Sequence, residues 1–145
     1  MKEKTARVQW KGAGKAGQGL ITTETAALQN YPYGFSSRFD DDRAGTNPEE
    51  LLGAAHAACF TMAFSFAADK AGYATREVLT NAKVYLVREG EGFAIERIDL
   101  HLEASIDGID DETFQQLAQG AKRDCPLSKA LQSVPQITLH ASLRP

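Results

Sequence analysis

The sequence lacks an excess of positive charge and has only two cysteines, and each shortage argues against a class of protein. A formal net charge of −3 does not supply the basic surface that a phosphate backbone requires, so we expect no nucleic acid partner. The N-terminal segment MKEKTARVQW has no apolar stretch behind its lysines, so we identify no signal peptide and expect a cytoplasmic protein. In that compartment two reduced cysteines are better explained by chemistry or packing than by a structural disulfide.

The length and the periodicity of the sequence predict a single domain over residues 1–145, of the α+β class. Strands and helices occur in blocks, without the alternation that a parallel α/β sheet needs, so we expect antiparallel sheets around a central buried helix. The predicted strands lie at about 3–11, 18–24, 34–39, 78–88, 97–106 and 136–143, and the predicted helices at about 48–71, 111–122 and 126–133.

The central helix begins with strong signals. Asn47 is a suitable N-cap, Pro48 suits the first helical position, and Glu49 and Glu50 oppose the positive end of the helix dipole. Residues 51–68 carry no fixed charge, and a helix that is apolar on every side is expected to be buried. The segment is long enough to span a membrane, but its many alanines and its polar side chains make it too weakly hydrophobic, so we expect no membrane partner.

The segment at residues 12–17, GAGKAG, matches the glycine pattern of a dinucleotide-binding loop. Such a loop must open a helix whose N-terminus meets the pyrophosphate, whereas here the glycines run into β-branched residues. We therefore predict a hairpin loop and no nucleotide cofactor.

The two cysteines occupy different environments. Cys125 directly precedes Pro126 at the start of a short helix, where the backbone amides stabilise a thiolate. Cys59 lies in the middle of the apolar helix, where burial should raise the pKa of its thiol. Lowering that pKa from about 8.5 to about 6 would require about 3.4 kcal/mol. One arginine in contact could contribute about 4 kcal/mol at an effective dielectric constant near 20, so a nucleophilic Cys59 requires a buried arginine beside it.

A buried arginine would itself need a carboxylate, and Glu49 and Glu50 are the nearest candidates in the sequence. Ten residues of straight helix would place Glu49 about 15 Å from Cys59, which is too far for one guanidinium to contact both. We therefore predict a kink or break between residues 53 and 56. A continuous helix would argue against a shared network within one subunit.

Three other interpretations follow from the residues alone. Cys59 could be a small core residue in a non-catalytic protein that binds a hydrophobic ligand. His56, Cys59 and Cys125 could bind zinc, although they lack the paired C-x-x-C spacing. Arg38 could be an ordinary solvated charge.

Three segments resemble one family. PYGFSSRF, GTNPEELLGAAHAACF and CPLSKAL closely resemble the osmotically inducible protein C (OsmC) family, which is related to the organic hydroperoxide resistance proteins, and the resemblance covers essentially the whole chain. It implies that Cys59 is the peroxidatic thiol, that Cys125 resolves it, and that an arginine and the glutamate of the N-P-E motif, Glu49, activate the site. The organic hydroperoxide resistance proteins carry this arginine in the N-terminal glycine-rich region, where this sequence has only the lysines Lys11 and Lys15. The resemblance therefore assigns the arginine to Arg38, as in OsmC proper.

The resemblance also implies an activity and an assembly. Members of this family are thiol peroxidases that form intertwined homodimers with the active site at the subunit interface. Their substrate is a peroxide, and an external dithiol or thiol protein reduces the resulting disulfide. No metal, flavin or nicotinamide is implied. The choice between hydrogen peroxide and organic hydroperoxides, and the subunit that donates Arg38, stay open.

Overall fold

The computed structural model describes all residues from 1 to 145 and divides them into two compact units. We call residues 1–51 the N-terminal unit and residues 52–145 the C-terminal unit. The single domain over residues 1–145 stays a prediction.

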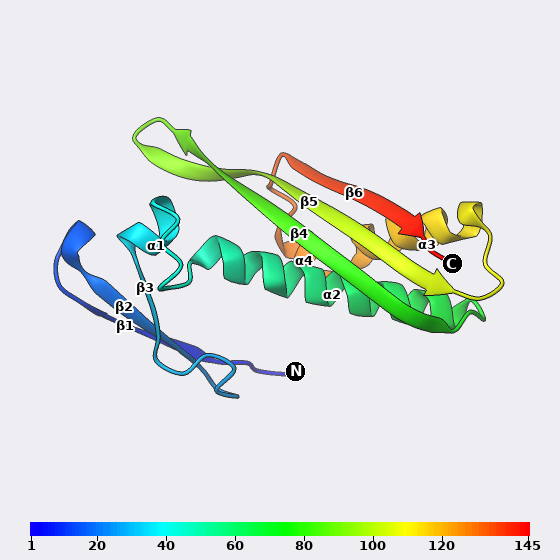
Figure 1. Cartoon of the computed structure of the whole chain (residues 1–145), viewed down its shortest axis with the longest axis horizontal. Coiled ribbons are helices and arrows are strands. Elements are labelled where there is room, and N and C mark those ends of the chain that lie inside the picture. The colour runs from blue at the N-terminus through cyan, green and yellow to red at the C-terminus, as the bar shows by residue number, and fades with distance from the viewer. The chain divides into compact units, whose positions relative to one another are not determined.

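The N-terminal unit contains a three-stranded antiparallel sheet in the order β1-β2-β3 (Figure 1). Its strands are β1 (Ala6–Lys11), β2 (Gln18–Thr23) and β3 (Tyr31–Gly34). The glycine-rich segment joins β1 to β2 through a short 3₁₀ turn, η1 (Gly14–Ala16), and Gly12 and Gly14 adopt positive φ angles there. The predicted hairpin loop is therefore confirmed, and these glycines serve a turn.

Residues 35–39 form a helix, α1 (Phe35–Phe39), so the predicted extended segment at 34–39 is wrong. The Phe35 and Phe39 rings lie one helical turn apart and are tilted by 48° to each other, with centroids separated by 5.0 Å. Ser37 stabilises the turn because its Oγ accepts a hydrogen bond from the Gly34 N–H at 3.0 Å and donates to the Thr46 carbonyl at 2.7 Å. This turn determines where Arg38 projects.

The long apolar segment forms one continuous helix, α2 (Pro48–Lys70). It starts as predicted, because Asn47 Oδ1 accepts the Glu50 N–H at 2.8 Å. The predicted kink or break between residues 53 and 56 is wrong. Gly53 is buried, and a Cβ built on it would approach a Val84 methyl group at 3.4 Å. Gly53 therefore packs beside the neighbouring strand with room for an ordinary van der Waals contact, and it does not interrupt the helix.

The C-terminal unit contains a second three-stranded sheet, in the order β4-β5-β6. Strands β4 (Thr75–Glu89) and β5 (Gly92–Ile106) form a long antiparallel hairpin. Strand β6 (Gln136–Leu143) departs from the predicted antiparallel arrangement, because it runs parallel to β5. The connection contains α3 (Asp111–Asp124) and α4 (Pro126–Ala130), and a parallel pair requires a crossover of this kind. Asp110 caps α3, because its Oδ1 accepts the Thr113 N–H at 3.1 Å.

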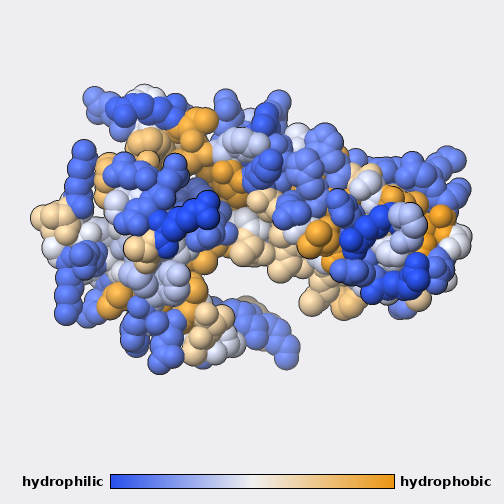
Figure 2. Space-filling model, viewed as in Figure 1, coloured by the Kyte–Doolittle hydropathy of each residue, from blue (hydrophilic) through white to orange (hydrophobic).

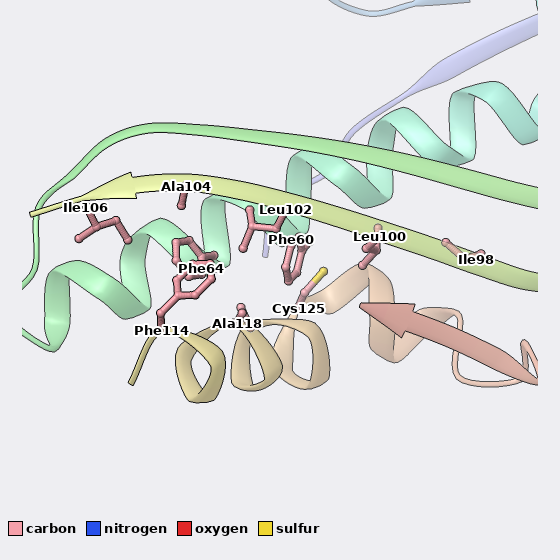
Figure 3. Close-up of a cluster of buried hydrophobic side chains, with 11 residues drawn as sticks. Phe60, Phe64, Ile98, Leu100, Leu102, Ala104, Ile106, Phe114, Ala118 and Cys125 are labelled. Atoms are coloured by element: carbon pink, nitrogen blue, oxygen red, sulfur yellow. The ribbon is translucent and has the colours of Figure 1, made fainter. Parts of the chain in front are cut away.

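The core of the C-terminal unit lies between one face of β5, α2 and α3 (Figure 3). The Phe64 ring of α2 meets the Phe114 ring of α3 edge-on, with centroids 5.6 Å apart. The members of this cluster share nearly complete burial and come from these three elements and from Cys125, which follows α3; they are Phe60, Phe64, Ile98, Leu100, Leu102, Ala104, Ile106, Phe114, Ala118, Ala121 and Cys125.

Helix α2 is buried on one face only in the single chain, whereas the sequence predicts cover on every side. By length and composition α2 is apolar enough to span a membrane, and 28% of its apolar window is buried in the single chain. Ala54, Ala58, Met62 and Phe66 are exposed at four-residue intervals, with Met62 at 60% and Phe66 at 67%. Pale-orange apolar side chains are visible at the surface along the course of α2 (Figure 2). We call these four residues the apolar stripe of α2.

A buried polar contact joins α2 to α4. His56 is 0% exposed, and its Nε2 lies 2.8 Å from Ser128 Oγ. Its Nδ1 has no hydrogen-bond partner. Burial lowers the pKa of His56 below its ordinary value of 6.5, so the ring stays neutral in the folded protein near neutral pH.

We expect acidification to destabilise the fold through His56. Because burial lowers the pKa of His56, the unfolded chain binds a proton at this ring before the folded chain does. As the pH falls below 6.5, the free energy of unfolding should decrease by at most about 1.4 kcal/mol per pH unit from this group. Urea unfolding at a series of pH values measures the slope. In His56→Gln the slope over this range should be smaller, and an unchanged slope would contradict the assignment.

Candidate functional site

The two cysteine side chains meet in the C-terminal unit. Cys59 lies on the middle of α2, and Cys125 is the residue between the end of α3 and the start of α4. Both are free thiols, Cys125 buried and Cys59 half-buried, and their sulfur atoms are 2.8 Å apart. The fold therefore brings together two thiols that are 66 positions apart in the sequence.

The surroundings of Cys59 act on its thiol in opposite directions. Burial is the largest influence and raises the pKa of Cys59, and its interaction with the Cys125 thiol raises it further. The Leu127 N–H donates to the Cys59 sulfur and lowers this pKa. The predicted rise in the pKa of Cys59 is therefore confirmed, and its thiolate needs stabilisation beyond that of one backbone amide.

The start of α4 contacts both cysteines. Cys125 is the N-cap of α4 and Pro126 follows it, as predicted. The amide of Leu127, in the first turn, is directed at Cys59. The sequence indicated a favourable helix start beside Cys125, but it did not show that a backbone amide from this start binds the partner sulfur.

Arg38 and Glu49 form the pair that the sequence predicts, within the N-terminal unit. Arg38 Nη2 lies 2.6 Å from Glu49 Oε1, and Arg38 Nε lies 3.2 Å from each oxygen of the carboxylate. The Arg38 side chain is 37% exposed and that of Glu49 is 11% exposed. A two-nitrogen contact of this kind fixes the plane of the guanidinium and leaves Nη1 available to another group.

Glu50 takes a different role from Glu49. Its carboxylate accepts a hydrogen bond from the Thr46 hydroxyl, and its N–H binds Asn47, so it stabilises the first turn of α2. It is not a partner of Arg38 in this structure.

The four predicted site residues therefore form two pairs, Arg38 with Glu49 and Cys59 with Cys125, and the pairs belong to different units. Glu49 and Cys59 are ten positions apart on the continuous helix α2, which corresponds to a rise of about 15 Å. That length is too great for one guanidinium to contact both residues of the same helix.

The candidate zinc ligands His56, Cys59 and Cys125 make other contacts in this structure. His56 Nε2 contacts Ser128 Oγ, and the two sulfurs contact each other. No group of three or more His, Cys, Asp or Glu side chains in the structure is arranged to hold a metal ion.

Two contributors to this region were missed by the sequence analysis, Leu127 and Ser128. One signal was available for Ser128, because Cys125 and Ser128 are three positions apart at a helix start and so project on the same side. No sequence signal identifies the residue that this serine contacts 72 positions away.

Comparison with known proteins places this geometry in a family. Residues 39–140 match the family model described as OsmC-like protein. The chain is 44% identical over 141 residues to Peroxiredoxin OsmC of Escherichia coli (strain K12), covering 97% of this chain and 96% of the relative. It is 29% identical over 126 residues to the organic hydroperoxide resistance protein OhrB of Bacillus subtilis (strain 168), covering 87% of this chain and 88% of that protein.

A solved structure supports the same assignment. The crystal structure of the organic hydroperoxide resistance protein OhrB of Bacillus subtilis superimposes with a TM-score of 0.67 at 27% identity, covering 97% of this chain and 98% of that one. The matched family model, the curated relatives and the shared fold all agree with the motifs around the two cysteines. The chain therefore belongs to the OsmC-like protein family.

Proposed function

We propose that this protein is a thiol-dependent peroxidase that reduces organic hydroperoxides, hydrogen peroxide or both. The observation that carries the proposal is the 2.8 Å contact between two free thiols, in a chain 44% identical to a protein named a peroxiredoxin. The distant relative named for organic hydroperoxide resistance supports a hydroperoxide substrate. Reduction of peroxides in oxidative or osmotic stress is the corresponding cellular role.

The proposed reaction has three steps. The Cys59 thiolate attacks the terminal peroxide oxygen, the O–O bond breaks, and water or an alcohol leaves while Cys59 becomes a sulfenic acid. The Cys125 thiol then attacks the Cys59 sulfur, releases water and forms a disulfide. An external dithiol or thiol protein reduces this disulfide and restores both thiols. The two cysteines and the reductant account for all the electrons, so the reaction requires no metal, flavin or nicotinamide.

Arg38 is proposed to stabilise the Cys59 thiolate and to orient the peroxide, with Glu49 holding the guanidinium in place. The Cys59 thiolate requires a positive charge, because burial raises the pKa of Cys59 and only one backbone amide opposes this rise. The bidentate contact with Glu49 leaves Arg38 partly exposed and able to meet a further group. The length of α2 between Glu49 and Cys59 favours a site completed by two chains.

A homodimer is proposed on the same grounds. The apolar stripe of α2 exposes Met62 and Phe66 on a helix whose opposite face is already buried. Large apolar side chains aligned at one surface mark an interaction site, and a second copy of this chain would cover them. A dimer also supplies a second Arg38 for each Cys59. The proposed location of this dimer is the cytoplasm.

Substitution of the cysteines tests the reaction. Cys59→Ser should reduce peroxide consumption to the background rate, because the attacking sulfur is lost. Cys125→Ser should still consume one equivalent of peroxide but should accumulate sulfenic acid at Cys59, which dimedone labelling and mass spectrometry detect. A Cys59→Ser protein that consumes cumene hydroperoxide and hydrogen peroxide at the original rate would refute the peroxidase. Binding of a hydrophobic ligand without turnover would then be the better account.

Substitution of Arg38 tests the activation of the thiol. Arg38→Lys keeps a positive charge but loses the planar two-nitrogen contact with Glu49, so the second-order rate constant for Cys59 oxidation should fall by about 100-fold. Stopped-flow measurement under single-turnover conditions gives this constant. Arg43→Lys, at an exposed arginine of the following loop, is the matched control and should retain the original rate. Equal rates in both variants would remove Arg38 from the site.

A charge on the apolar stripe tests the dimer. Phe66→Asp should convert the dimer to a monomer, because a carboxylate would be buried in an apolar contact, and light scattering after size exclusion measures the mass. Phe93→Asp is the control, since Phe93 is 50% exposed at the far end of the β4–β5 hairpin. A wild-type monomer, or a Phe66→Asp protein that stays dimeric, would contradict this interface.

A further inference from the structure

A second contact lies one helical turn from the sulfur pair. His56 precedes Cys59 by three residues on α2, and Ser128 follows Cys125 by three residues at the start of α4. His56 Nε2 lies 2.8 Å from Ser128 Oγ, the same separation as that between the two sulfur atoms. The same two segments are therefore joined twice, once through sulfur and once through a nitrogen and a hydroxyl.

The pair is buried and has no competing side-chain partner. His56 is 0% exposed, Ser128 is 8% exposed, and Nδ1 of His56 has no hydrogen-bond partner. It is the one hydrogen bond between a side chain of α2 and a side chain of α4, beside the bond from the Leu127 N–H of α4 to the Cys59 sulfur. The histidine side of this contact is held by the core, because His56 has no exposed surface on which water could replace Ser128.

Helix α4 needs a directional contact because it is short. It contains five residues, and Cys125 is the single residue that separates it from α3. Leu127 and Leu131 pack against the core through apolar contacts, which do not fix the rotation of a single helical turn. Two directional contacts supply it, the His56–Ser128 bond and the bond from the Leu127 N–H to the Cys59 sulfur, and Ser128 lies on the same side of α4 as Cys125.

The peroxidase cycle changes one of these two contacts. Once Cys59 carries the sulfenic oxygen, the thiol–thiol hydrogen bond no longer holds Cys125 in place. The His56–Ser128 contact is not consumed in any step, so it persists while Cys125 must find the Cys59 sulfur. For a displacement at sulfur the attacking atom must be held close and in line, and the rate depends on that geometry.

We propose that His56 and Ser128 are positioning residues for the second step, in which Cys125 closes the disulfide. This inference depends on the proposed peroxidase function and assigns the His56–Ser128 pair to one of its steps. The first step, attack of Cys59 on the peroxide, does not need Cys125 to be positioned. Loss of the pair should therefore slow disulfide formation selectively and prolong the lifetime of the sulfenic acid.

Ser128→Ala tests the proposal by separating the two rate constants. In a single-turnover stopped-flow experiment the rate constant for Cys59 oxidation should stay within about twofold of the wild-type value, while the rate constant for disulfide formation should fall about tenfold. With excess peroxide, mass spectrometry should show more sulfinic acid at Cys59, because peroxide then competes with Cys125. Ser128→Thr keeps the hydroxyl and should restore the wild-type ratio of the two rates.

Two further variants keep the test decisive. Thr138→Val is the matched control, since it removes a 2.6 Å hydrogen bond to Asp99 in the same unit but away from the sulfurs, and its rate ratio should be unchanged. If Ser128→Ala does not fold, the double substitution His56→Leu with Ser128→Ala removes both polar partners and should show the same selective loss.

The outcomes distinguish this proposal from the function beneath it. Disulfide formation at the wild-type rate in folded Ser128→Ala, or equal slowing of both steps, would overturn the positioning role. Failure of the wild-type protein to form the Cys59–Cys125 disulfide at all would instead overturn the peroxidase.

Discussion

The contact between the Cys59 and Cys125 sulfur atoms constrains the architecture of the whole C-terminal unit. One sulfur belongs to a helix that precedes the sheet, and the other belongs to the crossover between β5 and β6. The parallel pairing of β6 with β5 makes this crossover necessary, and the crossover carries α3 and α4 across the face of the sheet that α2 covers. The core is thus a means of holding two distant thiols at contact distance.

Burial creates a second constraint, because the same core that positions Cys59 also raises the pKa of its thiol. The backbone amide of Leu127 opposes this effect locally. Arg38, the arginine proposed to oppose it, is held by Glu49 within the N-terminal unit. The ten helical positions between Glu49 and Cys59 and the exposed apolar stripe of α2 are the two observations behind our proposal that a second copy of the chain supplies the guanidinium.

Local signals in the sequence predicted local structure well. Asn47 and Pro48 gave the start of α2, Cys125 and Pro126 gave the start of α4, and the charge requirement together with the family resemblance paired Arg38 with Glu49. The wrong predictions concern features that depend on contacts between residues far apart in the sequence. Phe35 and Phe39 suit a strand as well as a helix until the Ser37 hydrogen bonds select the turn. The direction of β6 depends on the path of the crossover, and the exposure of Met62 depends on which elements reach α2; neither is encoded in a periodicity.

The 66-position separation of the cysteines also governs how strongly oxidation would affect the folded chain. A covalent link across a loop of that length restricts the unfolded ensemble by about 4 kcal/mol in the chain-entropy model. The oxidised protein would thus be markedly harder to unfold than the reduced one, because the link removes conformations from the unfolded chain. In the proposed peroxidase cycle, the free energy of unfolding of the C-terminal unit would then rise with each oxidation and fall with each reduction.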